Sequence, residues 1–256
     1  MNCVIREKGK KAAELFLDAL FPPGIYCICC GSLTDGSRAY SLCDECIKKL
    51  HWINGRACEK CGKALQDTYR GSRCGDCMTY THSFERGYSC LAYGMYERQL
   101  IFDFKYNGKR YLARHFGDIL YDRIILENIN PDVIMPIPVH KSREKRRGYN
   151  QAALMAKRLA VRMNVPFDGK SLYRKKQTGQ LRGLAPAERE AVLEGAFDVK
   201  GKGCRAKSVL LIDDIYTTGA TADACSRILY ACGAKNVYLL TLASGGNSLP
   251  EQRRKQ

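Results

Sequence analysis

Residues 208–225 read S-V-L-L-I-D-D-I-Y-T-T-G-A-T-A-D-A-C. The four apolar residues at 209–212 predict a buried strand, which we expect to end at the acidic pair Asp213 and Asp214. A hydroxyl-rich turn follows and leads into a helix predicted over 219–232. A strand, an acidic pair, a turn and a helix in this order are typical of an open α/β sheet, in which ligands bind at the carboxyl ends of the strands.

The chemistry of this stretch suits a ribose phosphate. Backbone N–H groups at the start of a helix, together with the helix dipole, favour a phosphate group, and Gly219 would let the backbone approach it closely. Two carboxylates beside a phosphate would repel it unless they face hydrogen-bond donors, such as the vicinal hydroxyls of a ribose. A ribose 5-phosphate satisfies both requirements.

The stretch closely resembles the signature of the type I phosphoribosyltransferases, which bind phosphoribosyl pyrophosphate (PRPP). The resemblance implies that Asp213 and Asp214 contact the ribose hydroxyls, that residues 217–221 wrap the 5-phosphate, and that Mg²⁺ accompanies PRPP. The PRPP-binding residues it assigns are Asp213, Asp214, Tyr216, Thr217, Thr218, Gly219, Ala220 and Thr221. A buried strand that ends in an ordinary Asp-capped turn is the structural alternative.

Net charge points to an anionic partner. The chain has 256 residues, 42 Lys and Arg against 26 Asp and Glu, and a formal charge of +16. Residues 139–182 contain 13 basic and 2 acidic residues, a net +11. Such clustering favours phosphate groups, either on a small ligand or along a nucleic-acid backbone. A solvated basic face is the alternative.

A cysteine repeat predicts two metal sites. The pattern C-x2-C-x12-C-x2-C occurs twice, 31 residues apart, and four thiolates on two tight turns suit a closed tetrahedral Zn²⁺ site. Because eight thiolates leave no open position, both zinc ions would be structural. The expected ligands are Cys27, Cys30, Cys43 and Cys46, then Cys58, Cys61, Cys74 and Cys77. The repeat favours sequential pairing, but cross-braced ligation would use the same residues, and Cys29 could replace a neighbour.

Cysteine content also bears on compartment. Glu14 and Asp18 interrupt the apolar segment near the N-terminus, so it is unlike a signal peptide, and no apolar run reaches membrane-spanning length. We therefore expect a reducing cytoplasm, where Cys-x2-Cys pairs more often hold metal than form disulfides.

The chain divides into four expected parts. These are an amphipathic helix within 1–24 (residues 7–20), a double zinc ribbon at 25–80, an α/β domain with a parallel sheet at 81–246, and a basic tail at 247–256. Strands are expected at 87–93, 133–137, 208–212 and 236–242, and helices at 96–106, 112–127, 150–163, 186–194 and 219–232.

A second anion site is expected at residues 135–151, M-P-I-P-V-H-K-S-R-E-K-R-R-G-Y-N-Q, read as a strand, a long basic loop and a helix start. Arginines can bind pyrophosphate in a bidentate manner, or follow a DNA backbone while Tyr149 stacks on a base. The candidate residues are Pro138, His140, Arg143, Arg146, Arg147, Gly148, Asn150 and Gln151. A solvated loop is the alternative.

The whole chain is similar to the ComF (ComFC/GntX-like) competence family. The resemblance lies in R-G-Y-N-Q at 147–151, L-F-P-P at 20–23 before the cysteines, and the segments 177–180, 188–189 and 195–197. It implies natural transformation, single-stranded DNA and a competence or helicase-type protein partner reached through the zinc ribbon. One departure is Val192, where the family pattern leads us to expect Asn.

Three functions stay open. As an enzyme, the protein would transfer the phosphoribosyl group of PRPP to an acceptor with release of pyrophosphate, by positioning and electrostatics, since no strong general base stands out. As a binding protein, it would keep the ribose-phosphate pocket as a sensor or a nucleic-acid contact. A nucleotide-salvage phosphoribosyltransferase with appended ribbons is the alternative, although no base-binding element is recognisable.

Overall fold

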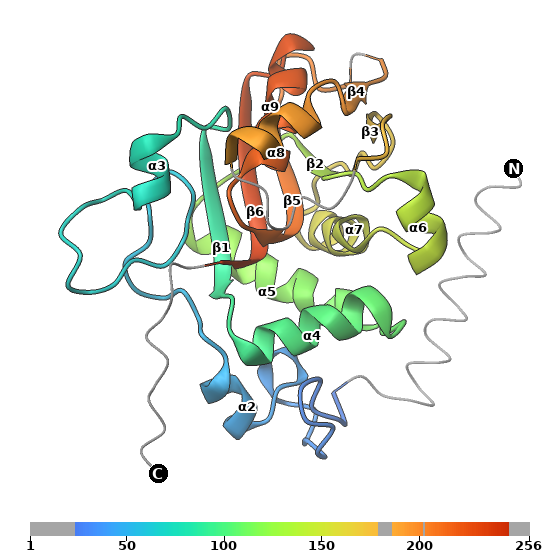
Figure 1. Ribbon diagram of the computed structural model, residues 1–256. Coiled ribbons are helices and arrows are strands. Elements are labelled where there is room, and N and C mark those ends of the chain that lie inside the picture. Colours follow the sequence, from blue (N-terminus) through green and yellow to red (C-terminus); the bar gives the residue numbers. More distant parts are fainter. Residues whose placement is uncertain (1–23, 179–185, 202, 246–256) are drawn as a thin grey trace, which may run out of the picture. The chain divides into compact units, whose positions relative to one another are not determined.

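The structure is a computed structural model, which describes residues 24–178, 186–201 and 203–245 (Figure 1). The chain divides after Leu50 into a smaller unit, Met1–Leu50, and a larger unit, His51–Gln256. The expected helix at 7–20, the L-F-P-P segment at 20–23, the motif residue Gln180 and the basic tail lie outside the described residues. Across the described part of the chain, no helix is long and apolar enough to cross a membrane.

A four-stranded parallel sheet forms the centre of the larger unit, as predicted. Its order is β1 (Arg86–Ala92), β6 (Asn236–Ser244), β5 (Ser208–Tyr216) and β2 (Val133–Pro136). The apolar run at 209–212 is completely buried because β5 is a central strand with neighbours on both sides. All four strands therefore end at the same edge of the sheet.

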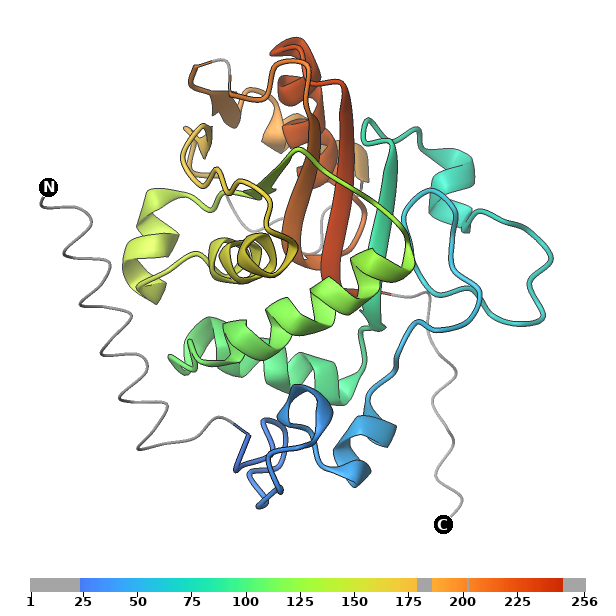
Figure 2. The ribbon, with the colours of Figure 1, turned by 180° about the vertical axis from the view of Figure 1, so that it is seen from behind.

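Helices cover both faces of this sheet. Helices α5 (Leu112–Leu126) and α7 (Gln151–Met163) pack on one face, which Figure 2 shows from the front, and α9 (Ala220–Ala231) packs on the other. Helix α7 is amphipathic, and its Met155 and Leu159 are fully buried. The remaining long elements are α4 (Met95–Tyr106) and α8 (Pro186–Leu193), so every helix and strand expected from residue 84 onward is present.

Two local expectations were wrong. Strand β5 does not end at Asp213 but continues to Tyr216, and Asp213 is paired with Thr241 of β6. The expected basic loop contains a helix, α6 (Lys141–Arg147), which begins after His140 and ends at Gly148 with φ +80°. A short antiparallel pair of strands, β3 (Leu172–Arg174) and β4 (Phe197–Val199), with α8 between them in the chain, was not anticipated.

The two halves of the cysteine repeat belong to different units. The first half contains the short helices η1 (Ala39–Ser41) and α2 (Asp44–Lys49) of the smaller unit. The second half, with α3 (Gly75–Thr79), lies in the larger unit, and its cysteines share a hydrophobic core with the sheet. The sequence predicted a double zinc ribbon at 25–80, followed by an α/β domain at 81–246. The second half of the repeat shares its buried core with that α/β domain.

Candidate functional site

The eight repeat cysteines form two clusters that fit zinc. The first cysteine cluster is Cys27, Cys30, Cys43 and Cys46, and the second is Cys58, Cys61, Cys74 and Cys77. The sulfur atoms of each cluster lie within 4.8 Å of one another, and one S···S distance in each is 3.7 Å. A tetrahedral site with Zn–S bonds of about 2.3 Å requires S···S distances of about 3.8 Å. Each cluster uses one repeat, so the pairing is sequential, and Cys29 belongs to neither cluster.

Backbone groups around the clusters favour the thiolate form. The N–H of Cys43 donates to Cys27 Sγ at 3.4 Å, and the N–H of Cys74 donates to Cys58 Sγ at 3.2 Å. Hydrogen bonds with Ser32 lower the pKa of Cys30 to about 6. The thiolate is the form that binds metal, so these donors favour Zn²⁺ binding. In the opposite direction, burial raises the pKa of Cys46, and hydrogen bonds with neighbouring thiols raise the pKa of Cys61 and of Cys77.

The predicted PRPP residues come together at the end of β5. Asp213, Asp214 and Tyr216 lie in the strand, and residues 217–219 connect it to α9. We call residues 217–221, which include the first two residues of α9, the phosphate loop. Gly219 precedes the first residue of α9 with φ +82°, a conformation that favours glycine. The first turn of α9 directs backbone N–H groups without intrahelical partners into this loop.

The acid pair, Asp213 and Asp214, has a cation beside it. Lys105 Nζ, from α4, contacts Asp214 Oδ1 at 2.8 Å, and both side chains are less than one fifth exposed. Burial, and then the charge of Asp214, raises the pKa of Asp213 to about 7. The raised pKa reduces the negative charge of Asp213 near neutral pH, and the Lys105 ammonium lies against the other carboxylate of the pair. Its oxygens can accept hydrogen bonds from vicinal hydroxyls without placing an uncompensated double charge beside a phosphate.

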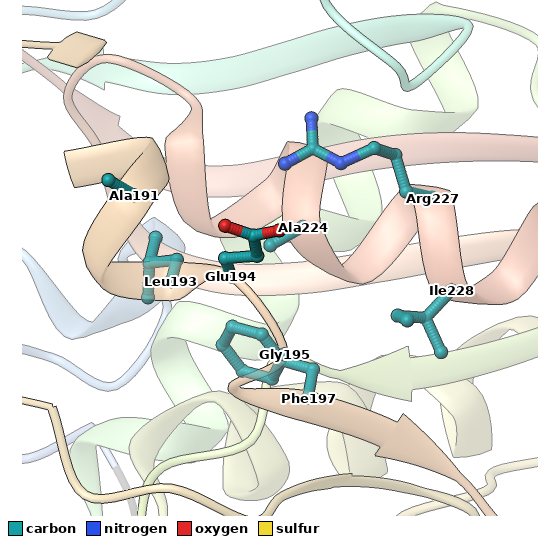
Figure 3. A pocket seen from close by; sticks show the side chains of 8 residues that line it. All are labelled: Ala191, Leu193, Glu194, Gly195, Phe197, Ala224, Arg227 and Ile228. Atoms are coloured by element: carbon teal, nitrogen blue, oxygen red, sulfur yellow. The ribbon is translucent and has the colours of Figure 1, made fainter. Parts of the chain in front are cut away.

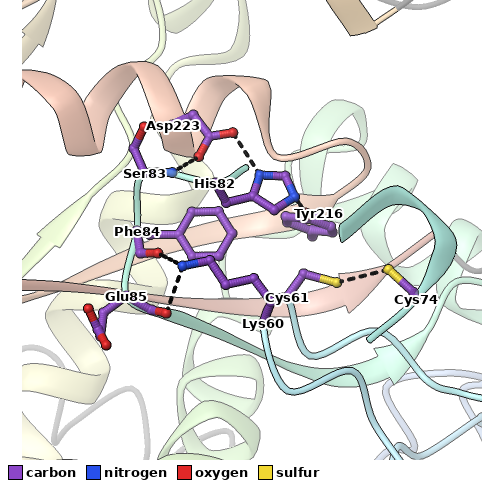
Figure 4. Close-up of polar contacts among 9 residues, drawn as sticks. All are labelled: Lys60, Cys61, Cys74, His82, Ser83, Phe84, Glu85, Tyr216 and Asp223. Atoms are coloured by element: carbon purple, nitrogen blue, oxygen red, sulfur yellow. Dashed lines mark hydrogen bonds and ion pairs between the residues drawn. The ribbon is translucent and has the colours of Figure 1, made fainter. Parts of the chain in front are cut away.

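Three buried side chains next to the phosphate loop, those of His82, Tyr216 and Asp223, contact one another (Figure 4). His82 Nδ1 lies 2.8 Å from Asp223 Oδ2, and His82 Nε2 lies 3.1 Å from the hydroxyl of Tyr216. A Cβ atom at Gly219 would lie 2.8 Å from Cε1 of His82, so the imidazole fills the space behind the glycine. The sequence analysis gave neither His82 nor Lys105 a role in this site, because neither residue belongs to a local motif.

The loop encloses a small hollow. Its volume is about 50 Å³, and the residues around it include Asp213, Thr217, Gly219 and Thr221. This room suits a group of a few atoms, such as a phosphate, because a single water needs about 10–15 Å³ on the same measure. The rest of a bound PRPP would therefore lie outside the hollow.

The second predicted site follows β2 at the same edge of the sheet, since the N–H of Ile137 donates to the carbonyl of Ile212 at 2.9 Å. Pro138 comes directly after this bond, and His140 caps α6 by accepting from the N–H of Ser142. Asn150 caps α7 and also donates to the carbonyl of Ile137 at 3.1 Å. These three residues shape the connection between β2 and α7.

The arginines of α6 point to different neighbours. Arg143 donates to the carbonyl of Thr178 at 3.2 Å, whereas Arg147 donates to Gln151 Oε1 at 3.1 Å and to the hydroxyl of Tyr106 at 3.0 Å. Arg146 is exposed. Gly148 accepts a bond through its carbonyl from Arg110 at 2.9 Å. The predicted residues thus lie in one segment, but Arg143 and Arg147 contact different parts of the protein.

Arg174 is a site residue that sequence reasoning did not single out. It is 8% exposed, donates to Thr178 Oγ1, and has a buried Nε with no hydrogen-bond partner among the residues that the structure describes. Burial lowers its pKa, and so does the charge of Arg143, while Asp213 acts in the opposite direction. Two guanidinium groups held near one threonine and close to Asp213 favour an anion between β5 and β3.

Tyr149 is not available for base stacking, contrary to expectation. It is 6% exposed, its hydroxyl donates to the carbonyl of Phe104, and its ring packs against Arg110. Exposed aromatic rings nearby include Phe102 and Tyr106 of α4, which contact each other at 5.0 Å between centroids.

A larger cavity lies away from both predicted sites. Figure 3 shows its lining side chains, which come from α8, the following turn, β4 and α9, with Glu194 and Arg227 as the charged members. Its volume is about 360 Å³, and none of its lining residues belongs to the phosphate loop or to α6. Val192, the departure from the expected Asn, lies on α8 and is 36% exposed.

Comparisons with known proteins agree with this architecture. Residues 109–255 match the phosphoribosyl transferase domain model, and residues 16–78 match the double zinc ribbon domain model. The protein thus combines a phosphoribosyltransferase domain with a double zinc ribbon.

Similarity to curated proteins identifies the family within this class of two-domain proteins. Competence protein F of Haemophilus influenzae is 30% identical over 212 residues, covering 79% of this chain and 90% of that protein. Competence protein ComFC of Bacillus subtilis is 29% identical, covering 78% and 83%. DNA utilization protein YhgH of Escherichia coli K12 is 24% identical, covering 86% and 96%. The chain belongs to the ComF family of competence proteins.

Proposed function

We propose that the protein binds PRPP or ribose 5-phosphate, with Mg²⁺, at the acid pair and the phosphate loop, in a role related to competence and the use of internalised DNA. The observation that carries this proposal is the loop itself. A left-handed glycine, a helix start and a hollow of about 50 Å³ adjoin two carboxylates on the same strand. The 5-phosphate would occupy the hollow, and the ribose hydroxyls would contact Asp213 and Asp214.

Two arginines support a place for the pyrophosphate of PRPP. Arg143 and Arg174 both bond to Thr178, and Arg174 and Asp213 are close enough for their charges to interact. An anion there would relieve the repulsion between the two guanidinium groups and could accept from Nε of Arg174, which has no partner in the described part of the chain. When bound, Mg²⁺ would neutralise part of the pyrophosphate charge beside the acid pair. Transfer to an acceptor would then require only a group positioned opposite the leaving pyrophosphate.

Calorimetric titration with PRPP and Mg²⁺ tests the binding proposal. Asp213→Asn/Asp214→Asn keeps the side-chain shapes and removes the charges, so we expect a loss of about 1.5–3 kcal/mol for each charge-assisted hydrogen bond. Asp132→Asn is the matched control, because Asp132 accepts from the N–H of Ser208 at 2.8 Å, at the opposite end of the same strand. Equal PRPP affinity in the double variant and the wild type would refute the site.

We also propose that single-stranded DNA binds beside α6. This helix carries five basic residues and one acidic residue, and the exposed rings of Phe102 and Tyr106 adjoin it through Arg147, whose guanidinium lies 5.0 Å from the centroid of Tyr106. Basic side chains that follow a backbone, with aromatic rings for bases, are the elements of sequence-tolerant single-strand binding. The names of the curated relatives, competence and DNA utilization proteins, favour the same ligand.

Fluorescent oligonucleotides titrated at several salt concentrations test this second proposal. Each neutralised phosphate should add roughly −0.7 to the slope of log K against log[salt]. Arg146→Ala/Arg147→Ala should make the slope shallower, whereas Phe102→Ala/Tyr106→Ala should weaken binding with the slope unchanged. A signal insensitive to salt and to both double variants would place DNA binding elsewhere or remove it.

A further inference from the structure

The second cysteine cluster lies directly against the sheet that carries the phosphate loop. The N–H of Gly87, in β1, donates to the carbonyl of Lys60 at 2.7 Å. A Cβ atom at Gly62 would lie 2.6 Å from the carbonyl oxygen of Gly87, so only glycine allows this approach of the cysteine turn to the strand. The four cysteines belong to the same buried core as Tyr216 and Ala222, which flank the loop.

Tyr216 connects this cluster to the loop. It is the last residue of β5 and is 3% exposed. Lys63, two residues after Cys61, places its Nζ 5.4 Å from the centroid of the Tyr216 ring and contacts Asp76 Oδ2 at 2.6 Å. Lys63 follows the turn that carries Cys58 and Cys61, and Asp76 lies between Cys74 and Cys77 in α3. The segments that carry the ligands of the second cluster therefore lie beside the Tyr216 ring.

His82 completes the connection (Figure 4). Because Asp223 accepts from Nδ1–H of His82 at 2.8 Å, Nε2 is left to accept from the hydroxyl of Tyr216 at 3.1 Å. Asp223 also accepts from the N–H of Ser83 at 2.7 Å, and its own N–H donates to the carbonyl of Gly219 at 2.8 Å. A continuous series of contacts therefore runs from the cysteine turns to the loop glycine.

We propose that the second cysteine cluster, when it holds zinc, braces the phosphate loop through Tyr216 and His82, so that metal occupancy and anion binding are coupled. The inference rests on the proposed ribose-phosphate site. Zinc supplies the folding energy of such turns, and their loss would remove one wall from Tyr216 and release His82 from its position behind Gly219. Because coupling between two ligands is reciprocal, a bound ribose phosphate should slow the loss of zinc from this cluster.

A variant with one remaining metal site isolates the effect. In the full chain, replacing all four cysteines of the first cluster with serine leaves the second cluster as the only ribbon site. Zinc release to a chromogenic chelator should then slow about fivefold to tenfold with saturating ribose 5-phosphate, within the usual range of coupling. Tyr216→Phe, which removes only the hydroxyl, should reduce this protection. His51→Ala should leave it unchanged, because His51 makes a similar bond to Glu97 on α4, at 3.2 Å, outside the series.

Hydrogen exchange without any ligand separates this inference from the proposed function. Removing zinc should speed amide exchange at residues 217–223 at least tenfold while β2 stays protected, and zinc-loaded Tyr216→Phe should speed it to a smaller extent. Failure of the wild type to bind ribose 5-phosphate would reject the proposed function, and exchange would still decide the brace. If zinc removal unfolds β2 as well, amide exchange in the zinc-loaded Tyr216→Phe variant decides whether the inference holds. Unchanged exchange at 217–223 in that loaded variant would overturn the inference.

Discussion

Of the single substitutions on α4, Lys105→Met should affect the acid pair most, because it removes the cation that contacts Asp214. The Lys105 ammonium lies 2.8 Å from Asp214 Oδ1, and the two side chains are 17% and 13% exposed. Removing one partner of a buried ion pair costs about 3–5 kcal/mol. Asp213, whose pKa is already raised to about 7 by burial and by Asp214, can take up a proton and relieve part of this cost. We therefore expect unfolding free energy to fall by about 2–4 kcal/mol at neutral pH.

Urea unfolding followed by tryptophan fluorescence measures this loss, and Lys109→Met is its matched control. Lys109 lies near the end of α4 and contacts Asp103 Oδ2 at 2.7 Å, but its side chain is 39% exposed and Asp103 keeps its bonds to Gln99 and Asn107. The control should cost at most about 1 kcal/mol. Adding Asp214→Asn to Lys105→Met should restore much of the stability. Equal losses in both lysine variants, or no recovery, would refute the reasoning.

Three other predictions concern the metal sites, the acid pair and the loop glycine. Metal analysis should return two zinc ions per chain, and Cys58→Ser should lower the stability of the larger unit in urea, whereas Cys27→Ser should leave it unchanged. Because the pKa of Asp213 is raised in the folded state, its protonated form stabilises the fold at pH 5, and this contribution is lost as pH rises through 7. The free energy of unfolding of Asp213→Asn, measured from pH 5 to 8, should therefore increase relative to that of the wild type. Gly219→Ala should lower the melting temperature, since φ +82° costs alanine about 1–2 kcal/mol and its Cβ would meet His82.

The sheet and its main helices were predictable because local patterns determine them. The apolar run at 209–212 has the length and composition of a buried parallel strand, and the spacing of apolar residues in 151–163 is that of a helix. The two cysteine clusters were equally predictable, because fixed spacing on tight turns brings thiolates together without help from the rest of the fold.

The support of the site could not be predicted, because it depends on contacts between distant parts of the chain. Lys105 meets Asp214 across 109 residues, and His82 meets Asp223 across 141. The attachment of the second cysteine cluster to β1 depends on Gly62, whose importance appears only when the neighbouring strand is known. Helix α6 was not predicted for another reason. Its lysines and arginines are good helix formers, but their positive charge was interpreted as that of an anion-binding loop.

The orientation of α6 bears on whether PRPP and DNA compete. Arg143 and Arg147 are one helical turn apart, yet Arg143 lies beside Thr178 and Arg174, whereas Arg147 packs on Tyr106. The first environment contains a buried guanidinium and a nearby carboxylate, which suits a compact anion such as pyrophosphate. The second contains exposed rings beside exposed cations, which suits a strand of nucleotides. Two neighbouring anions on one short helix repel each other through space, even where they share no contact. The proposed ligands should therefore weaken each other's binding. This antagonism should decrease as the salt concentration rises, because salt screens the repulsion.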